Sequence, residues 1–155
     1  MKQLRRRLGL AQGQEYGSAQ GQDKGMYGSM AIQDIETYTL QSAATAVGNG
    51  SAVYVGGYNG AQMVEVVNTG TGTATVLLQG SYGTLDGSGN QLWYPVGYMQ
   101  IDNNSNPIRT AGSIAVAASS SHVYQVLDLY QQLECVVQSV TGSVSVSAKA
   151  IVVAI

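Results

Sequence analysis

The chain has 155 residues, a net charge of −2 at pH 7 and one cysteine. This length predicts a single domain, with or without a tail, and a single cysteine cannot form an internal disulfide. Only 10% of the residues are charged, against about 25% in an ordinary soluble domain, so we expect partners to cover much of the surface. The negative charge argues against nucleic-acid binding by the body of the protein, and no apolar run of about 18 residues predicts a membrane span.

The first 30 residues predict a basic, extended arm. Their charged residues are the cations Lys2, Arg5, Arg6, Arg7 and Lys24 and the acids Glu15 and Asp23. Residues 11–18 (AQGQEYGS) recur in residues 19–29 with a short insertion, and neither copy has an apolar period. Such a segment cannot bury enough apolar surface to fold alone. We expect an arm at residues 1–30, held on a partner or left as a free linker, and a β-sandwich domain at residues 31–155.

The rest of the chain predicts short strands separated by glycine-rich turns. The apolar runs are residues 39–47, 51–55, 61–67, 73–79, 92–101, 112–118 and 122–127. Gly48-Asn49-Gly50 is a hairpin signal between the first two. Residues 80–90 and 102–107 are predicted loops, since they consist of Gly, Ser, Asn, Asp and Pro with few apolar residues.

The C-terminus carries the clearest pattern. Val144, Val146, Ala148, Ala150 and Val152 alternate with polar residues up to Lys149, as in a half-buried strand. Thr141-Gly142 joins this strand to residues 133–140, which predicts a hairpin. Beyond Lys149 the outward positions are Ile151, Val153 and Ile155, so this end is expected to be central in a sheet or covered by a neighbour. Together these strands predict an all-β fold, an antiparallel β-sandwich or jelly roll with an extended N-terminal arm.

Groups with catalytic or metal-binding potential are few. His122 begins a strand, Cys135 lies within one, and no G-x-S-x-G nucleophile motif occurs. We therefore predict no catalytic residues, no metal and no cofactor. The loops that begin at Asp86 and Asp102 imitate the start of a calcium loop, but both lack its later ligands, so turn formation explains them better.

Two surface features leave alternatives open. Arg5-Arg6-Arg7 could contact an acidic protein surface, remain a solvated tail or touch nucleic-acid phosphates. Trp93 and Tyr94, with Tyr82 and Tyr98, could form a platform on which sugars stack. The alternative, which we prefer, is that Trp93 fills the sandwich.

Four segments of the C-terminal half carry a resemblance to a known group of proteins. These are residues 75–81 (TVLLQGS), Trp93, residues 130–133 (YQQL) and residues 140–144 (VTGSV). Across roughly residues 73–150 the chain resembles the small β-sandwich proteins of tailed-phage virions, among them capsid cement or decoration proteins and some tail-associated modules. The resemblance implies a non-enzymatic oligomer, with a trimer favoured, on a capsid lattice.

The resemblance therefore implies a capsid cement protein, made in the host cytoplasm and located in the virion, that bridges subunits of the major capsid protein. The predicted interface residues are Lys2, Arg5, Arg6, Arg7, Tyr16, Tyr27, Ile151, Val153 and Ile155. The alternative is a carbohydrate- or receptor-binding module of a phage tail or fibre.

Overall fold

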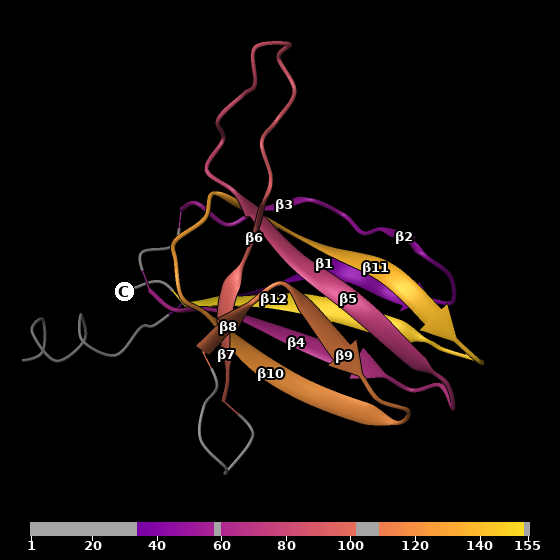
Figure 1. Cartoon of the computed structure of the whole chain (residues 1–155). Helices are drawn as coiled ribbons and strands as arrows, with labels where there is room; N and C mark the ends of the chain where they lie inside the picture. Colours follow the sequence, from indigo (N-terminus) through magenta and orange to yellow (C-terminus); the bar gives the residue numbers. More distant parts are fainter. Residues whose placement is uncertain (1–33, 58–59, 102–108, 154–155) are drawn as a thin grey trace, which may run out of the picture. The chain divides into compact units, whose positions relative to one another are not determined.

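A computed structural model describes residues 34–57, 60–101 and 109–153, which form two antiparallel sheets packed as a sandwich (Figure 1). This confirms the predicted fold class. The strands of the first sheet are, in order, β1 (Ile35–Ala44), β12 (Val146–Val153), β4 (Gln62–Asn68), β10 (Ser120–Val126), β7 (Gly97–Gln100) and β8 (Arg109–Ala111). In the second sheet the order is β2 (Gly48–Asn49), β11 (Gln132–Thr141), β5 (Thr73–Ser81) and β6 (Tyr94–Pro95), with β3 (Val53–Tyr54) paired to β11 and β9 (Ser113–Val116) paired to β5. None of the described segments is a helix long and apolar enough to cross a membrane.

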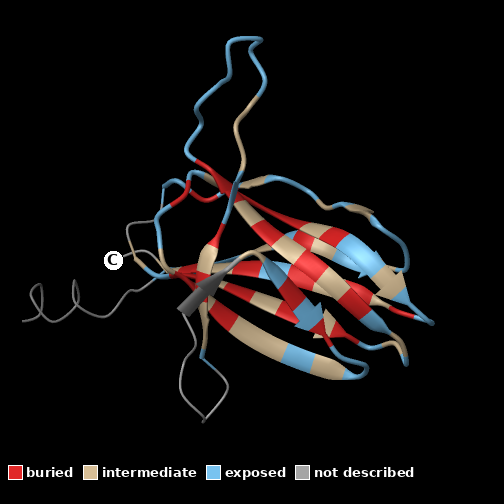
Figure 2. Ribbon diagram, in the orientation of Figure 1, coloured by how far each residue is buried: buried red, intermediate tan, exposed pale blue. Residues whose placement is uncertain are grey.

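The core lies between the sheets and follows from alternation along the strands. On β12, Val146, Ala148, Ala150 and Val152 are at most 1% exposed, as their spacing predicts. The facing side chains come from β5 and β11; they are Val76, Leu78, Leu133, Cys135 and Val137. Figure 2 shows the resulting bands of buried and half-buried residues along the central strands. Valine is the commonest residue of this interior, with leucine, alanine and tyrosine beside it, and the chain has no phenylalanine.

The predicted N-terminal hairpin is wrong. β1 begins at Ile35, earlier than the predicted residue 39, and pairs with β12 in the first sheet. Gly48 and Asn49, predicted as a turn, instead pair with Val137 and Val136 of β11 in the second sheet. The chain therefore passes from one sheet to the other between β1 and β2, a change that the Asn-Gly turn signal does not reveal.

The predicted C-terminal hairpin is also wrong. β11 pairs with β5 in the second sheet, whereas β12 pairs with β1 and β4 in the first. Gly142, with φ of 78°, belongs to the turn that carries the chain across the sandwich. The predicted strand at residues 92–101 likewise divides into β6 and β7, which lie in different sheets. Buried Val96 lies between them.

Candidate binding surfaces

Three tyrosines gather where β5, β6 and the start of β11 meet; we call Tyr82, Tyr94 and Tyr130 the tyrosine surface. The rings of Tyr82 and Tyr130 are stacked, with centroids 4.8 Å apart and planes at 27°. The Tyr94 ring lies 5.9 Å from that of Tyr82, tilted by 46°. Tyr130 is 4% exposed, whereas Tyr82 and Tyr94 are 44% and 41% exposed. The buried ring of Tyr130 therefore supports that of Tyr82, which in turn lies beside the exposed ring of Tyr94.

A glycine makes this arrangement possible. Gly80 pairs with Leu133 on one side and Tyr94 on the other. A Cβ on Gly80 would lie 2.3 Å from ring atoms of Tyr130, well inside contact distance. The ring of Tyr130 therefore rests directly on the backbone of β5, and any side chain at residue 80 would displace it.

Polar side chains form hydrogen-bonded pairs on the neighbouring strands. The amide of Gln91 donates a 2.8 Å hydrogen bond to the side chain of Gln132, and Gln79 donates a 2.7 Å hydrogen bond to Glu134. The Gln131 side-chain oxygen lies beside Gly83. Burial raises the pKa of Tyr130, and hydrogen bonding and electrostatic repulsion from Tyr82 and Asp128 raise it further. The Tyr130 hydroxyl thus stays protonated at neutral pH, beside the Tyr82 hydroxyl and the exposed carboxylate of Asp128.

The tyrosine surface differs from the predicted platform. Tyr82 and Tyr94 lie together as that hypothesis requires, but Tyr98 is 6% exposed and packs edge-on against Tyr124, 5.2 Å away in the first sheet. Trp93 is half-buried and is not part of the core, so the expectation that it fills the sandwich is wrong. Tyr130 was missed, because its contact with residue 80 is formed only by folding.

The predicted loop at residues 80–90 belongs to a projecting hairpin, seen at the top of Figure 1. Leu85 pairs with Gln91, and the backbone N–H groups of Asp86 and Leu92 donate to Asn90 and Thr84. One oxygen of the Asp86 carboxylate accepts from the backbone N–H groups of Ser88 and Asn90, both at 2.8 Å. These bonds lower the pKa of Asp86, those from Asn90 most. Turn formation therefore accounts for the calcium-like motif that begins at Asp86. The similar motif that begins at Asp102 falls outside the described residues.

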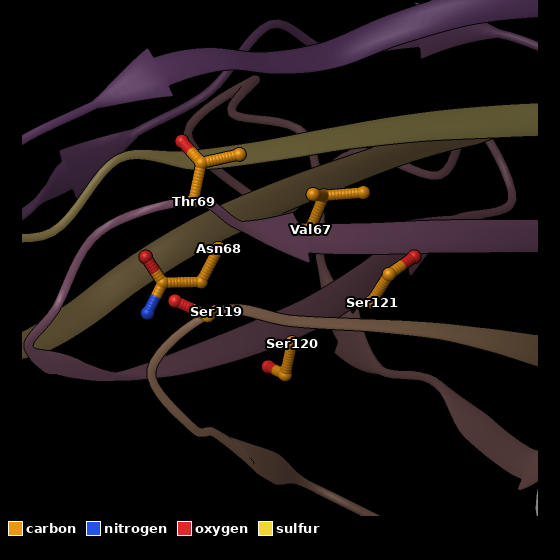
Figure 3. Close-up of a pocket in the computed structure, with 6 residues that line it drawn as sticks. All are labelled: Val67, Asn68, Thr69, Ser119, Ser120 and Ser121. Carbon is orange, nitrogen blue, oxygen red and sulfur yellow. The ribbon is translucent and has the colours of Figure 1, made fainter.

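An open groove of about 320 Å³ lies at the ends of β4 and β10 (Figure 3). It is lined by Val67, Asn68, Thr69, Ser119, Ser120 and Ser121. The amide of Asn68 donates to the carbonyls of Gly72 (2.9 Å) and Ala117 (3.0 Å) and accepts from the backbone N–H groups of Gly70 (3.0 Å) and Ser145 (3.2 Å). Asn68 thus uses all its hydrogen-bonding capacity to join three chain segments, which makes it a structural residue.

The outward face of the first sheet carries a patch of apolar side chains. Ile35 lies opposite Val153, and Ile151 lies opposite Met63. Ile35 is 63% exposed and the other three are half-buried; we call these four residues the outer apolar patch. β12 is flanked by β1 and β4, so the predicted interior position of this strand is correct. The predicted interface residues Lys2, Arg5, Arg6, Arg7, Tyr16, Tyr27 and Ile155 are outside the described part of the chain.

His122 and Cys135 are not brought together for chemistry. The Nδ1 atom of His122 lies 3.0 Å from the Gln100 amide nitrogen in the first sheet, and Cys135 faces the core from the second. Burial, with a smaller contribution from the charge of Glu134, raises the pKa of the Cys135 thiol to about 12. Within the described ranges, no three of the His, Cys, Asp and Glu side chains are placed to hold a metal ion.

We expect Cys135 of the native protein to resist a disulfide-exchange reagent at pH 8, because the thiolate that reacts is suppressed and shielded. Labelling should occur only as the protein unfolds, so its rate should rise with added denaturant. Since the unfolded chain loses this proton first, the raised pKa also predicts a loss of stability from about pH 9 upward. Stoichiometric labelling of fully folded protein would contradict the buried position.

Comparisons with known proteins identify fold relatives. No protein-family model matches the chain, and none of the curated proteins matches its sequence. Among solved structures, the SPBc2 prophage-derived protein YomS aligns with a TM-score of 0.54 and 20% identity, over 80% of this chain and 96% of YomS. The PBSX exported protein XepA aligns with a TM-score of 0.53 and 18% identity, over 79% of this chain but only 39% of XepA. At these identities the likeness establishes a shared β-sandwich fold.

Proposed function

We propose that this chain is a structural protein of a phage particle, and specifically a capsid cement protein that bridges subunits of the major capsid protein. The outer apolar patch is the observation that carries the proposal. Four apolar side chains on the outward face of a sheet, one of them 63% exposed, favour burial against another protein. The proposed occupant is a second copy of the chain, so that the body forms an oligomer, with a trimer favoured.

One of the solved structures with a similar fold is consistent with a protein encoded by a phage. The name of YomS describes that protein as prophage-derived, and the alignment covers 96% of it. A β-sandwich is enough for a protein whose role is to add contact area. Many weak contacts then multiply across a lattice through avidity.

The surroundings of the two most reactive side chains favour a role without catalysis. The Cys135 thiol faces the core with a raised pKa, which disfavours the thiolate needed for nucleophilic attack. His122 lies in the other sheet and could not activate it. Replacing both by alanine should therefore leave particle association unchanged apart from any loss of stability.

The N-terminal arm is proposed as the part that contacts the capsid. It holds Lys2, Arg5, Arg6, Arg7 and Lys24, whereas residues 31–155 hold the cations Arg109 and Lys149 and a surplus of acids. Attraction to an acidic protein surface is thus concentrated at one end of the chain.

Val153→Lys should weaken self-association while the monomer stays folded. The Val153 side chain is half-buried on the outward face, so the charge can reach solvent in the monomer but must be desolvated in an oligomer. Sedimentation velocity of the full chain should show a shift toward monomer. The protein concentration at which half the chains are associated should rise by about ten-fold or more, and ten-fold corresponds to roughly 1.4 kcal/mol.

Ser145→Lys is the matched control. Ser145 directly precedes β12 and follows the same alternation as Val153, but its neighbours on the outward face are polar. It should associate like the unmodified chain. Equal association by the two variants would show that the outer apolar patch is solvent-exposed in the working protein, and would remove the main support for the proposal.

A further inference from the structure

We infer that the tyrosine surface is a binding site for a neutral carbohydrate, a role beyond the proposed attachment to capsids. The site comprises the exposed rings of Tyr82 and Tyr94, supported by Tyr130, with Gln131 and Asp128 beside them.

The rings are held in place before any ligand arrives. Tyr82 stacks on buried Tyr130, which itself rests on the Gly80 backbone, and Tyr94 is held in β6 by pairing with Gly80. Exposed tyrosines usually lose rotamer freedom when they bind a ligand. Stacking on Tyr130 has already restricted that freedom for Tyr82, and strand pairing fixes the backbone of Tyr94, so less further ordering is needed.

The chemistry of the site matches a sugar ring. The face of an aromatic ring carries negative charge density, and the C–H bonds on the flat face of a pyranose are weakly positive, so the two attract. Sugar hydroxyls also need donors and acceptors at the edge of the contact. The amide of Gln131 and the carboxylate of Asp128 can supply both, and both side chains are exposed.

The distribution of charge selects against an anionic ligand. Of the side chains that the structure describes, Lys149 is the one Lys or Arg, and it lies on β12 in the other sheet. Phosphate and sulfate groups are usually held by Arg or Lys, whereas here Asp128 would repel them. A neutral polysaccharide suits the site better than an acidic one.

The test measures binding of the full chain to four neutral hexasaccharides, namely maltohexaose, cellohexaose, laminarihexaose and chitohexaose, with polygalacturonate as the anionic comparison. At least one neutral sugar should bind, and polygalacturonate should not. The double variant Tyr82→Ala/Tyr94→Ala should weaken that binding by about ten-fold or more through loss of both rings. Tyr38→Ala removes a half-buried tyrosine of β1, in the first sheet, and should leave binding unchanged.

Thermal unfolding of each variant shows whether a loss of binding comes from the missing ring or from a loss of folded structure. If the double variant fails to fold, the single variants Tyr82→Ala and Tyr94→Ala take its place. Failure of all four sugars to bind, binding that survives loss of both rings, or equal binding of polygalacturonate would each overturn the inference. If the double variant instead loses binding to purified capsids while no sugar binds, the surface is a protein contact. Capsid binding is measured separately, so either proposal can fail alone.

Discussion

Deletion of residues 2–30 should abolish attachment to capsids and leave the sandwich folded. The deleted segment carries five of the seven cations in the chain and none of the core residues. Losing a second set of contacts commonly reduces avidity by about 10²-fold or more. Co-sedimentation with empty capsids should therefore show little bound protein, while the melting temperature of the body stays close to that of the full chain.

A second variant separates charge from contact area. Replacing Lys2, Arg5, Arg6, Arg7 and Lys24 with glutamine keeps the length of the arm but removes its cations. If charge dominates, this variant should bind as weakly as the deletion and the intact chain should lose binding at high salt. Full capsid binding by the deletion variant would instead assign attachment to the body.

Asn68→Ala should be the most destabilising single substitution outside the apolar core. The side chain is 1% exposed and makes four hydrogen bonds, to the backbones of Gly70, Gly72, Ala117 and Ser145. Each buried backbone group left without a partner costs about 1–3 kcal/mol. Water entering from the open groove can satisfy some of them, so we expect a loss of roughly 3–5 kcal/mol in the free energy of unfolding, measured by urea denaturation.

Ser121→Ala is the control within the same groove, since Ser121 is exposed at the start of β10. It should change the free energy of unfolding by less than about 0.5 kcal/mol, as surface substitutions usually do. Asn68→Asp refines the test, because it keeps an oxygen that can accept from Gly70 and Ser145 but replaces the NH2 group that donates to Gly72 and Ala117. A stability of Asn68→Ala close to that of Ser121→Ala would show that Asn68 does not join the three segments.

The sequence by itself determined the fold class and much of the core. Alternation from Val144 to Val152 reflects a strand with one buried face, and this period depends only on the local geometry of extended backbone. The Asp86 turn is equally local, since its carboxylate bonds to N–H groups two and four residues away. The concentration of cations in residues 1–30 can be read directly from the sequence, because charge is a property of composition.

Only the tertiary structure decided which strands pair and which side chains meet. A strand alternates in the same way in either sheet, so residues 133–152 read as a hairpin although β11 and β12 belong to different sheets. The tyrosine surface depends on Tyr130 reaching Gly80, and the Asn68 junction depends on Ser145, 77 residues away. Such contacts are formed by packing between distant segments, and no local pattern along the chain encodes them.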